Sequence, residues 1–544
     1  NNGLHLHGVW HLSLTWGGLI MRWWTHVRML TVLLVVTGLG VGLVTQAPAG
    51  PASPRRGGTL RIAQIGEPPT LDNSATTVGV TSNIAVSIFE TLFAFDTNWV
   101  PRPLLAESSA ISQDGRTHTI KLRQNVLFHN GREMTAEDVA ASLIRWGKVG
   151  SRGAVVFQQV ESVRATDKYT VVIQLKEPFA PLYAFLALPS SMAAIMPKEI
   201  ADAAPAGPVT EYVGTGPYRF VEWIPNRHVK LTRWDRYVSR TEPASLMAGR
   251  RDALADDVIF YPVGNVATRI AGVQTGDYDL ADSISTDLYD QLRRDARVVP
   301  EVVKPGTWLV FFFNKRAGLM ANVKLRQAVL QALRMQPILQ VTIGDPDLYE
   351  LTPSIYPKGT PWYSEAGASW YNLGNVDRAK ALAAEAGYRG EPIRWLTTLQ
   401  YDWMFKSTTV AAAQLRQAGF NINQQVYEWA GVVERRARPA EWEMFTTGHG
   451  FVPDPALIDV FSPTYPGWWD SPAKTQLFND FNRTIDTRER QRIWHKLQEL
   501  VFTEGGWVKT GDFFILRLRS RNTQPQPGYV WSLAITTWNI SVAR

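Results

Sequence analysis

The chain has 544 residues, too many for a single hydrophobic core, so we expect two or three lobes. Hydrophobic residues make up 45% and charged residues 19%, which is typical of a folded protein and excludes a disordered one. The net charge of +7 is spread over interspersed Arg and Asp, which favours an ordinary solvated surface over a nucleic-acid groove. Cysteine is absent, so disulfides, thiolate catalysis and a Cys-linked lipid anchor are excluded.

The N-terminal segment has the order of an export signal. A basic stretch from Met21 to Arg28 precedes the apolar run from Met29 to Val44, and small residues follow at Ala47 and Ala49. The run is shorter than the ~20 residues of a membrane-spanning helix, although an uncleaved anchor is the alternative. We expect residues 1–49 to hold upstream residues and a signal peptide, residues 50–58 to form a Pro/Gly-rich linker, and the rest to be periplasmic or otherwise extracytoplasmic.

Alternating apolar residues predict strands in the first half of the chain. The first covers residues 59–65 and runs into Gly66-Glu67-Pro68-Pro69, which must leave the sheet because proline cannot donate to a ladder. Further predicted strands lie at 117–123, 168–176, 218–223, 229–233 and 257–261. One helix is predicted after Thr135, which with Asp138 approximates a capping box.

The second half is predicted to be richer in helices. Apolar residues recur at helical spacing in segments that begin near residues 325, 375, 409 and 487, and a strand is predicted at 420–427. Gly387 and Gly419 are typical residues for ending the second and third helices. Helices and strands mixed in this way indicate α/β lobes.

No catalytic constellation is found. The chain lacks a G-x-S-x-G elbow and an H-E-x-x-H motif, and its nine histidines show no metal-ligand spacing. We therefore expect no enzyme activity, no cofactor and no metal. His449 is predicted to lie in a flexible loop, Thr447 to Gly450, where it either reaches a ligand or is simply exposed.

The chain carries 21 tryptophans, and several aromatic residues lie in predicted loops. They are Tyr401, Trp403, Trp429, Trp468 and Trp469. Such rings suit a cleft that stacks on peptide side chains or sugar faces. The alternative, simple loop packing, stays open.

Six segments, in order along the chain, resemble the peptide/nickel-type (family 5) solute-binding proteins of ABC importers. The most specific is Ser112 to Trp146, with a strand ending in Leu-Arg, then Phe-His-x-Gly and Thr-Ala-x-Asp-Val. The others are 57–72, the GTGPY turn at 214–218, 323–329, 377–388 and Pro453-Asp454-Pro455.

The resemblance implies an α/β, periplasmic-binding-protein-like fold with two large lobes, hinge strands and an extra small lobe. The implied division is lobe I at 59–95, 213–305 and 512–544, the extra lobe II at 96–212, and lobe III at 306–511. The lobes would close on a ligand like a clamp. The chain would act as a monomer, bind no nucleic acid and dock on membrane permease subunits that are driven by separate ATPases.

The resemblance also implies ligand-binding residues. Glu67 matches an acidic residue that tends to line the cleft, and Asp454 is the nearest candidate to neutralise the α-ammonium of a peptide. Asp454 could instead simply cap a turn. The remaining candidates are Trp308, Tyr401, Trp403, His449 and Phe451. The segment Phe451-Val452-Pro453 departs from dipeptide binders, which carry another acidic residue there.

Three functions are compatible with these features. The first is an import receptor for a peptide or peptide-like solute. The second is a receptor of the same fold for an oligosaccharide or another solute, which the loop tryptophans favour. The third, a secreted hydrolase, would need a nucleophile and base or a metal cluster that the sequence does not show.

Overall fold

The computed structural model describes residues 55–529 and 533–542. The predicted export signal and most of the predicted linker lie outside these residues. None of the helices in the described part of the chain combines the length and the apolar character that crossing a bilayer requires.

The largest sheet among the described residues has eleven strands. In sheet order, its ten-strand path is β15 (Ile422–Val426), β14 (Ile393–Thr397), β16 (Met444–Gly450), β12 (Val298–Phe313), β17 (Trp507–Ser520), β11 (Leu280–Ile284), β1 (Thr59–Gln64), β10 (Asp257–Pro262), β9 (His228–Arg233) and β8 (Tyr218–Ile224). The eleventh strand, β13 (Tyr349–Glu350), pairs with β17. The strands predicted at 59–65, 218–223, 229–233, 257–261 and 420–427 are all present in this sheet.

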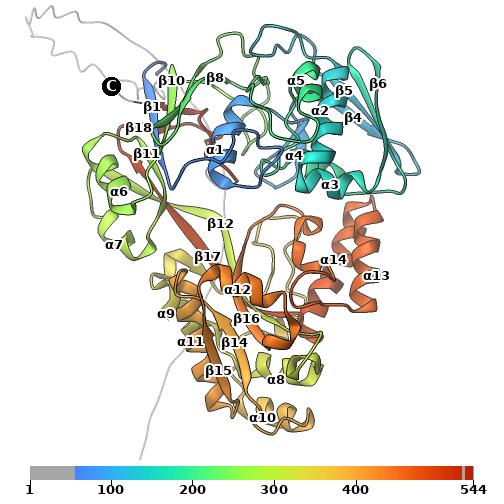
Figure 1. Ribbon diagram of the computed structural model, residues 1–544, viewed down its shortest axis with the longest axis vertical. Coiled ribbons are helices and arrows are strands. Elements are labelled where there is room, and N and C mark those ends of the chain that lie inside the picture. The colour runs from blue at the N-terminus through green and yellow to red at the C-terminus, as the bar shows by residue number, and fades with distance from the viewer. Residues whose placement is uncertain (1–54, 530–532, 543–544) are drawn as a thin grey trace, which may run out of the picture. The chain divides into compact units, whose positions relative to one another are not determined.

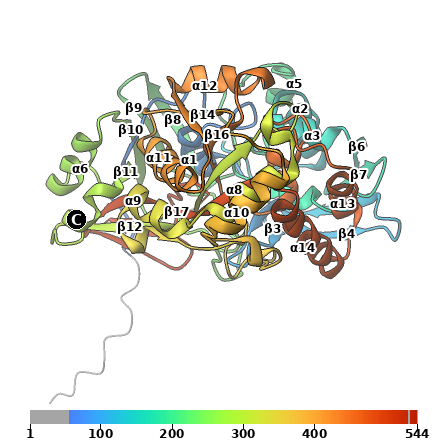
Figure 2. The ribbon, with the colours of Figure 1, turned by 90° about the horizontal axis from the view of Figure 1, so that it is seen from below.

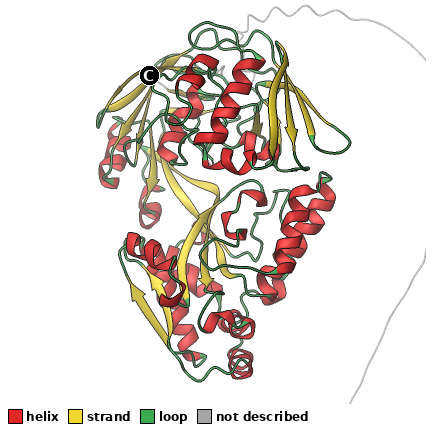
Figure 3. Cartoon of the chain, turned by 45° about the vertical axis from the view of Figure 1, so that its right-hand side comes forward, coloured by secondary structure: helices red, strands yellow, loops and turns green. Residues whose placement is uncertain are grey.

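Two long antiparallel strands, β12 and β17, form the middle of the sheet and link its two halves (Figures 1 and 3). Their register shifts between Val303 and Thr307. Gly306 lies at that shift, and a Cβ atom there would meet the carbonyl oxygen of Phe513 at 2.0 Å. Only glycine therefore allows the two strands to approach this closely. The hinge strands that the resemblance implies correspond to this pair.

The half of the sheet that runs from β11 to β8 packs against few helices and encloses a hydrophobic core. Here α1 (Gly79–Ile88) packs on β8, and α6 (Val266–Thr275) packs on β11 and β17. α7 (Tyr289–Leu292) contacts β12. The buried side chains include Leu60, Ile62, Ile84 and Phe260, and we name this part the first large lobe.

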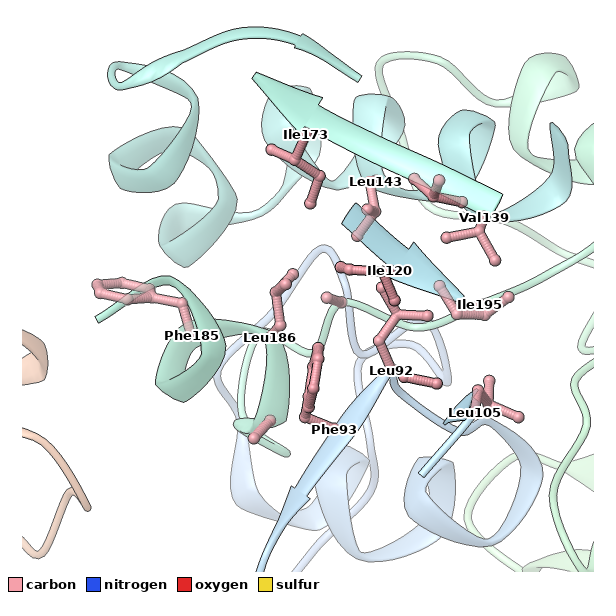
Figure 4. Close-up of a cluster of buried hydrophobic side chains, with 14 of the residues drawn as sticks. Leu92, Phe93, Leu105, Ile120, Val139, Leu143, Ile173, Phe185, Leu186 and Ile195 are labelled. Atoms are coloured by element: carbon pink, nitrogen blue, oxygen red, sulfur yellow. The ribbon is translucent and has the colours of Figure 1, made fainter. Parts of the chain in front are cut away.

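A small lobe is built on a separate four-stranded antiparallel sheet, in the order β4-β5-β7-β6. The strands are β4 (Ala106–Ile111), β5 (Thr117–Leu122), β7 (Thr170–Leu175) and β6 (Val160–Asp167). The helices are α2 (Ala136–Val149), α3 (Ser151–Phe157), α4 (Leu182–Ala187) and α5 (Lys198–Ala203). Figure 4 shows Ile120 and Ile173 from the sheet with Val139 and Leu143 from α2 in one core. The short strands β2 (Phe93–Phe95) and β3 (Pro101–Pro103) add Phe93 to it.

The second large lobe surrounds the other half of the main sheet with helices (Figure 2). They are α8 (Val323–Ala332), α9 (Met335–Ile343), α10 (Val376–Glu385), α11 (Asp402–Gln417), α12 (Trp429–Arg436), α13 (Pro472–Arg483) and α14 (Thr487–Thr503). Among these, α8 packs on α10, α9 on α11 and α13 on α14. The C-terminal strands β18 (Thr523–Pro525) and β19 (Ile540–Val542) form a separate pair.

Local sequence signals set some of the helix boundaries. The predicted capping box is confirmed at α2, where the Thr135 N–H donates to Asp138 at 2.8 Å. α14 begins at Thr487, where its helical segment is predicted to start, and Asp486 caps it, because the Asp486 side chain accepts from the Glu489 N–H. α11 begins seven residues before the predicted Thr409, at Asp402.

The residue-level lobe boundaries stay a prediction. Since β12 and β17 belong to both halves of one sheet, the chain has no single residue at which one large lobe ends and the other begins.

Candidate functional site

A cavity of ≈ 290 Å³ lies where the small lobe, the second large lobe and the C-terminal segment meet. This is close to the lower end of the range for small-molecule sites, about 300 Å³. Its lining residues are Arg152, Leu188, Pro189, Ser190, Trp308, His449, Gly450, Phe451, Val452, Leu457, Ile458, Asp459 and Leu533. Since segments from far apart in the sequence contribute, the cavity depends on how the lobes meet.

An aromatic pair from two neighbouring strands of the main sheet forms one wall. Trp308 on β12 and His449 on β16 are directly opposite in the antiparallel register, and their ring centroids are 5.1 Å apart. Residues opposite each other in a sheet point to the same face, so both rings face the cavity together. Trp308 is almost fully buried.

His449 is held in a neutral state. Burial, with a smaller effect from the positive charge of Arg436, lowers the pKa of His449 to about 4. The Nε2 atom lies 3.2 Å from the Tyr465 hydroxyl, and Phe312 packs edge-on against the ring. At pH 7 the site therefore offers an uncharged imidazole that can donate or accept one hydrogen bond.

The prediction of a flexible loop around His449 is wrong. Met444–Gly450 forms strand β16, which pairs with β12 along its length. The two glycines suggested a loop, but the ladder with a long central strand overrides local propensity. His449 is consequently fixed by the sheet.

Phe451 follows β16 and connects the lobes. Its ring packs edge-on against Trp99 with centroids 4.6 Å apart, and against Tyr356 at 5.9 Å. The Phe451 N–H donates to the carbonyl of Gly306 at 3.1 Å. An apolar ring therefore lines the cavity at the position where dipeptide binders are expected to carry a carboxylate.

The charged groups of the cavity wall are Arg152, at the start of α3, and Asp459, at the start of the 3-10 helix Asp459–Phe461. Arg152 Nη1 donates to Asp459 Oδ1 and to the Leu457 carbonyl, both at 3.1 Å. The buried Nε of Arg152 has no hydrogen-bond partner among the described residues. Neither residue was predicted, because the sequence around the start of a short helix does not indicate which other lobe that helix will face.

Asp454 has a structural role. Its oxygens accept from Arg490 at 3.1 and 3.2 Å, and one also accepts from the Ala456 N–H at 2.9 Å. Both side chains of the ion pair are buried. Asp454 therefore caps a turn and forms a buried ion pair, and its role in binding a ligand α-ammonium stays a prediction.

The other candidate residues lie outside the cavity lining. Glu67 accepts from Trp223 Nε1 at 2.5 Å and from the Asn226 N–H at 3.2 Å, which fixes the turn after β1. Tyr401 is 43% exposed and packs on Trp403 and Trp429 near the start of α11. Trp403 packs on Phe513. The structure therefore brings together Trp308, His449 and Phe451, and not Glu67, Tyr401, Trp403 or Asp454.

Within the described ranges, no three His, Asp or Glu side chains gather in a way that could hold a metal ion.

Comparisons with known proteins agree with this architecture. Residues 100–468 match the family of bacterial extracellular solute-binding proteins, family 5. The probable peptide ABC transporter periplasmic-binding protein y4tO of Sinorhizobium fredii is 30% identical over 69% of this chain and 72% of its own length. The oligopeptide-binding protein AppA of Bacillus subtilis is 24% identical over 87% of this chain and 92% of its own length.

Solved structures show the same fold. The substrate-binding protein CtaP of Listeria monocytogenes superposes with a TM-score of 0.79 at 18% identity, over 90% of this chain and 100% of its own. DppA of Helicobacter pylori, in complex with the peptide STSA, gives 0.72 at 22% identity, over 90% of this chain and 99% of its own. These likenesses confirm the predicted periplasmic-binding-protein-like α/β fold. The chain belongs to the bacterial extracellular solute-binding proteins, family 5.

Proposed function

We propose that this chain is the extracytoplasmic receptor of an ATP-driven importer, and that it captures a peptide or peptide-like solute in the cavity around Trp308, His449 and Phe451. The names of the relatives support this ligand class, since they include a probable peptide transporter component, an oligopeptide-binding protein and a glutathione-binding protein. The receptor works as a monomer, reaches its location through the N-terminal export signal and delivers its ligand to membrane permease subunits without turning it over.

The observation that carries the peptide assignment is the composition of the cavity wall. It combines one cation, Arg152, and one carboxylate, Asp459, with aromatic and aliphatic surface. A peptide carries both charges and apolar side chains, so it can exchange the internal ion pair for two pairs of its own. A neutral oligosaccharide has no charges that could replace either partner of this ion pair.

A thermal-shift screen of the purified chain tests the proposal. The ligands are di-, tri- and oligopeptides, N-acetylated and C-amidated versions of them, and neutral oligosaccharides. A true ligand stabilises the folded state by about 2.7 kcal/mol at a hundredfold excess over Kd. We expect stabilisation by peptides with both termini free and weaker stabilisation by blocked ones.

If only oligosaccharides stabilise the chain, it is a receptor for oligosaccharides and not for peptides. Turnover of a peptide or glycoside by the wild type, lost on a point mutation, would contradict the receptor role.

A further inference from the structure

A second cavity, of ≈ 540 Å³, lies in the second large lobe. Its wall is formed by the segment after β12, the beginning of α8, the segment Trp468 to Pro472, and Glu504. The residues that line the ligand cavity do not take part in it. The tryptophan pair that the sequence offers for ligand stacking, Trp468 and Trp469, lies here.

Three cations line this second cavity and have no ion pair among the described residues: Lys315, Arg316 and Arg326. The Lys315 ammonium donates to the Phe313 carbonyl at 3.1 Å. The Arg326 guanidinium donates to backbone carbonyls, among them that of Met320 at 2.7 Å. Arg316 lies over the Trp468 ring, with its Cζ atom 4.7 Å from the centroid. The hydrogen bonds of these side chains therefore go to neutral acceptors, and their charge is not compensated by a contact.

The two carboxylates of the wall form no ion pair with these cations among the described residues, although the charge of Glu504 raises the pKa of Arg326 against the larger, opposite effect of burial. Glu504 accepts from Trp469 Nε1 at 2.7 Å and from Ser471 Oγ at 2.9 Å. Asp470 is exposed to solvent. A further buried cation, Lys474, donates to the Phe461 carbonyl close by.

Burial and the neighbouring positive charges make the charged form of Lys315 unfavourable. Burial of the ammonium, together with the charges of Arg326 and Lys474, holds the pKa of Lys315 well below its usual value. An oxyanion among these groups would replace lost hydration with charge-assisted hydrogen bonds. Two helices of ten and twelve residues, α8 and α13, also begin at the cavity, at Val323 and Pro472. Their N-termini add positive potential there.

We propose that this cavity is a second binding site, distinct from the ligand cavity, which takes a small oxyanion such as a phosphate or a carboxylate between Lys315 and Arg316 and beside Trp468. The two cations neutralise the anion, and the buried indole of Trp468 forms part of the wall beside it. The site does not depend on the peptide assignment, because it shares no lining residue with the ligand cavity.

Isothermal titration of the whole purified chain with inorganic phosphate and, separately, with succinate tests this site at low salt. We expect saturable binding of at least one anion by the wild type. Lys315→Met and Arg316→Gln should each raise Kd about ten-fold or more, as expected for loss of a hydrogen bond to a charged group. Arg316 is exposed, so Arg316→Gln keeps the test valid if Lys315→Met fails to fold.

Lys380→Met is the matched control, because it removes one exposed positive charge from α10 without touching the cavity. It should bind the anions as the wild type does. Binding of phosphate alone or of succinate alone supports the site and identifies which oxyanion it prefers. The proposal is overturned if the wild type gives no saturable heat with either anion, or if Lys315→Met and Arg316→Gln bind as tightly as Lys380→Met.

Discussion

The guanidinium of Arg152 lies 3.1 Å from the carboxylate of Asp459, and this ion pair joins the small lobe to the second large lobe at the edge of the ligand cavity. The Asp459 side chain is 68% exposed. An ion pair with one exposed partner contributes ~0–1 kcal/mol to stability, so it can open at little cost when a ligand offers other partners.

Loss of either charge of the Arg152–Asp459 pair should affect ligand binding more than stability. Arg152→Gln and Asp459→Asn should leave the melting temperature nearly unchanged but weaken binding of free-termini peptides about ten-fold, because each removes one charged partner of the ligand. Titration calorimetry with an identified peptide measures the effect. The matched control is Glu177→Gln, which breaks another ion pair between the same lobes, Arg483 with Glu177 at 2.6 Å, away from the cavity. Equal losses in all three variants would show that lobe contact, and not ligand contact, is responsible.

Breaking the buried pair of Asp454 and Arg490 should cost far more stability. Asp454→Asn leaves the Arg490 guanidinium without a counter-charge between the rings of Trp362 and Phe481, and removal of one partner of a buried pair costs about 3–5 kcal/mol. Urea unfolding measures this loss. Peptide affinity of the folded fraction should stay within about two-fold of the wild type, since neither side chain lines the cavity. A large loss of affinity with unchanged stability would restore the ligand role of Asp454.

His449 predicts a pH dependence of stability. Its pKa is about 4 in the folded state against an ordinary value of 6.5, so the unfolded state binds the proton more readily. The contribution of His449 to stability is therefore complete above pH 6.5 and is lost as the pH falls from 6.5 towards 4. Between pH 7.5 and pH 4.5 the wild type should lose more free energy of unfolding than His449→Gln. Urea titrations at the two pH values test this, and parallel losses in both proteins would contradict the neutral buried state.

The close approach of β12 and β17 requires a residue without a side chain at position 306. A methyl group at this position would lie 2.0 Å from the Phe513 carbonyl oxygen, so β12 and β17 would have to move apart. Gly306→Ala should destabilise the protein by about 1–3 kcal/mol and shift the hinge strands. Gly264→Ala is the control, since its nearest neighbour would be an ordinary contact at 3.9 Å. Unfolding midpoints of the two variants give the comparison, and similar midpoints would show that the strands separate freely.

Much of the fold could be predicted from the sequence because its signals are local. The capping box at Thr135, the glycines after α10 and α11, and the alternation in β7 each act within a few residues. Strands β12 and β17 were not predicted. Their identity depends on pairing with each other across about two hundred residues, and the segments that contain Pro305 and Gly511 interrupt any local alternation.

The site was only partly predictable for the same reason. Trp308, His449 and Phe451 belong to one sheet and its immediate continuation, so a family motif near residue 450 indicates their neighbourhood. Arg152 reaches the cavity from a different lobe, and no spacing in the sequence encodes that contact. Asp454 was ambiguous because its partner, Arg490, is 36 residues away.

The position of β17 in the main sheet bears on how the protein is made. This strand, Trp507–Ser520, lies between β12 and β11, although it is encoded near the end of the chain. Until a ribosome has synthesised these residues, the two halves of the sheet cannot be joined, and the edges of β11 and β12 stay open. Neither large lobe can therefore complete its native sheet before this late segment has been made.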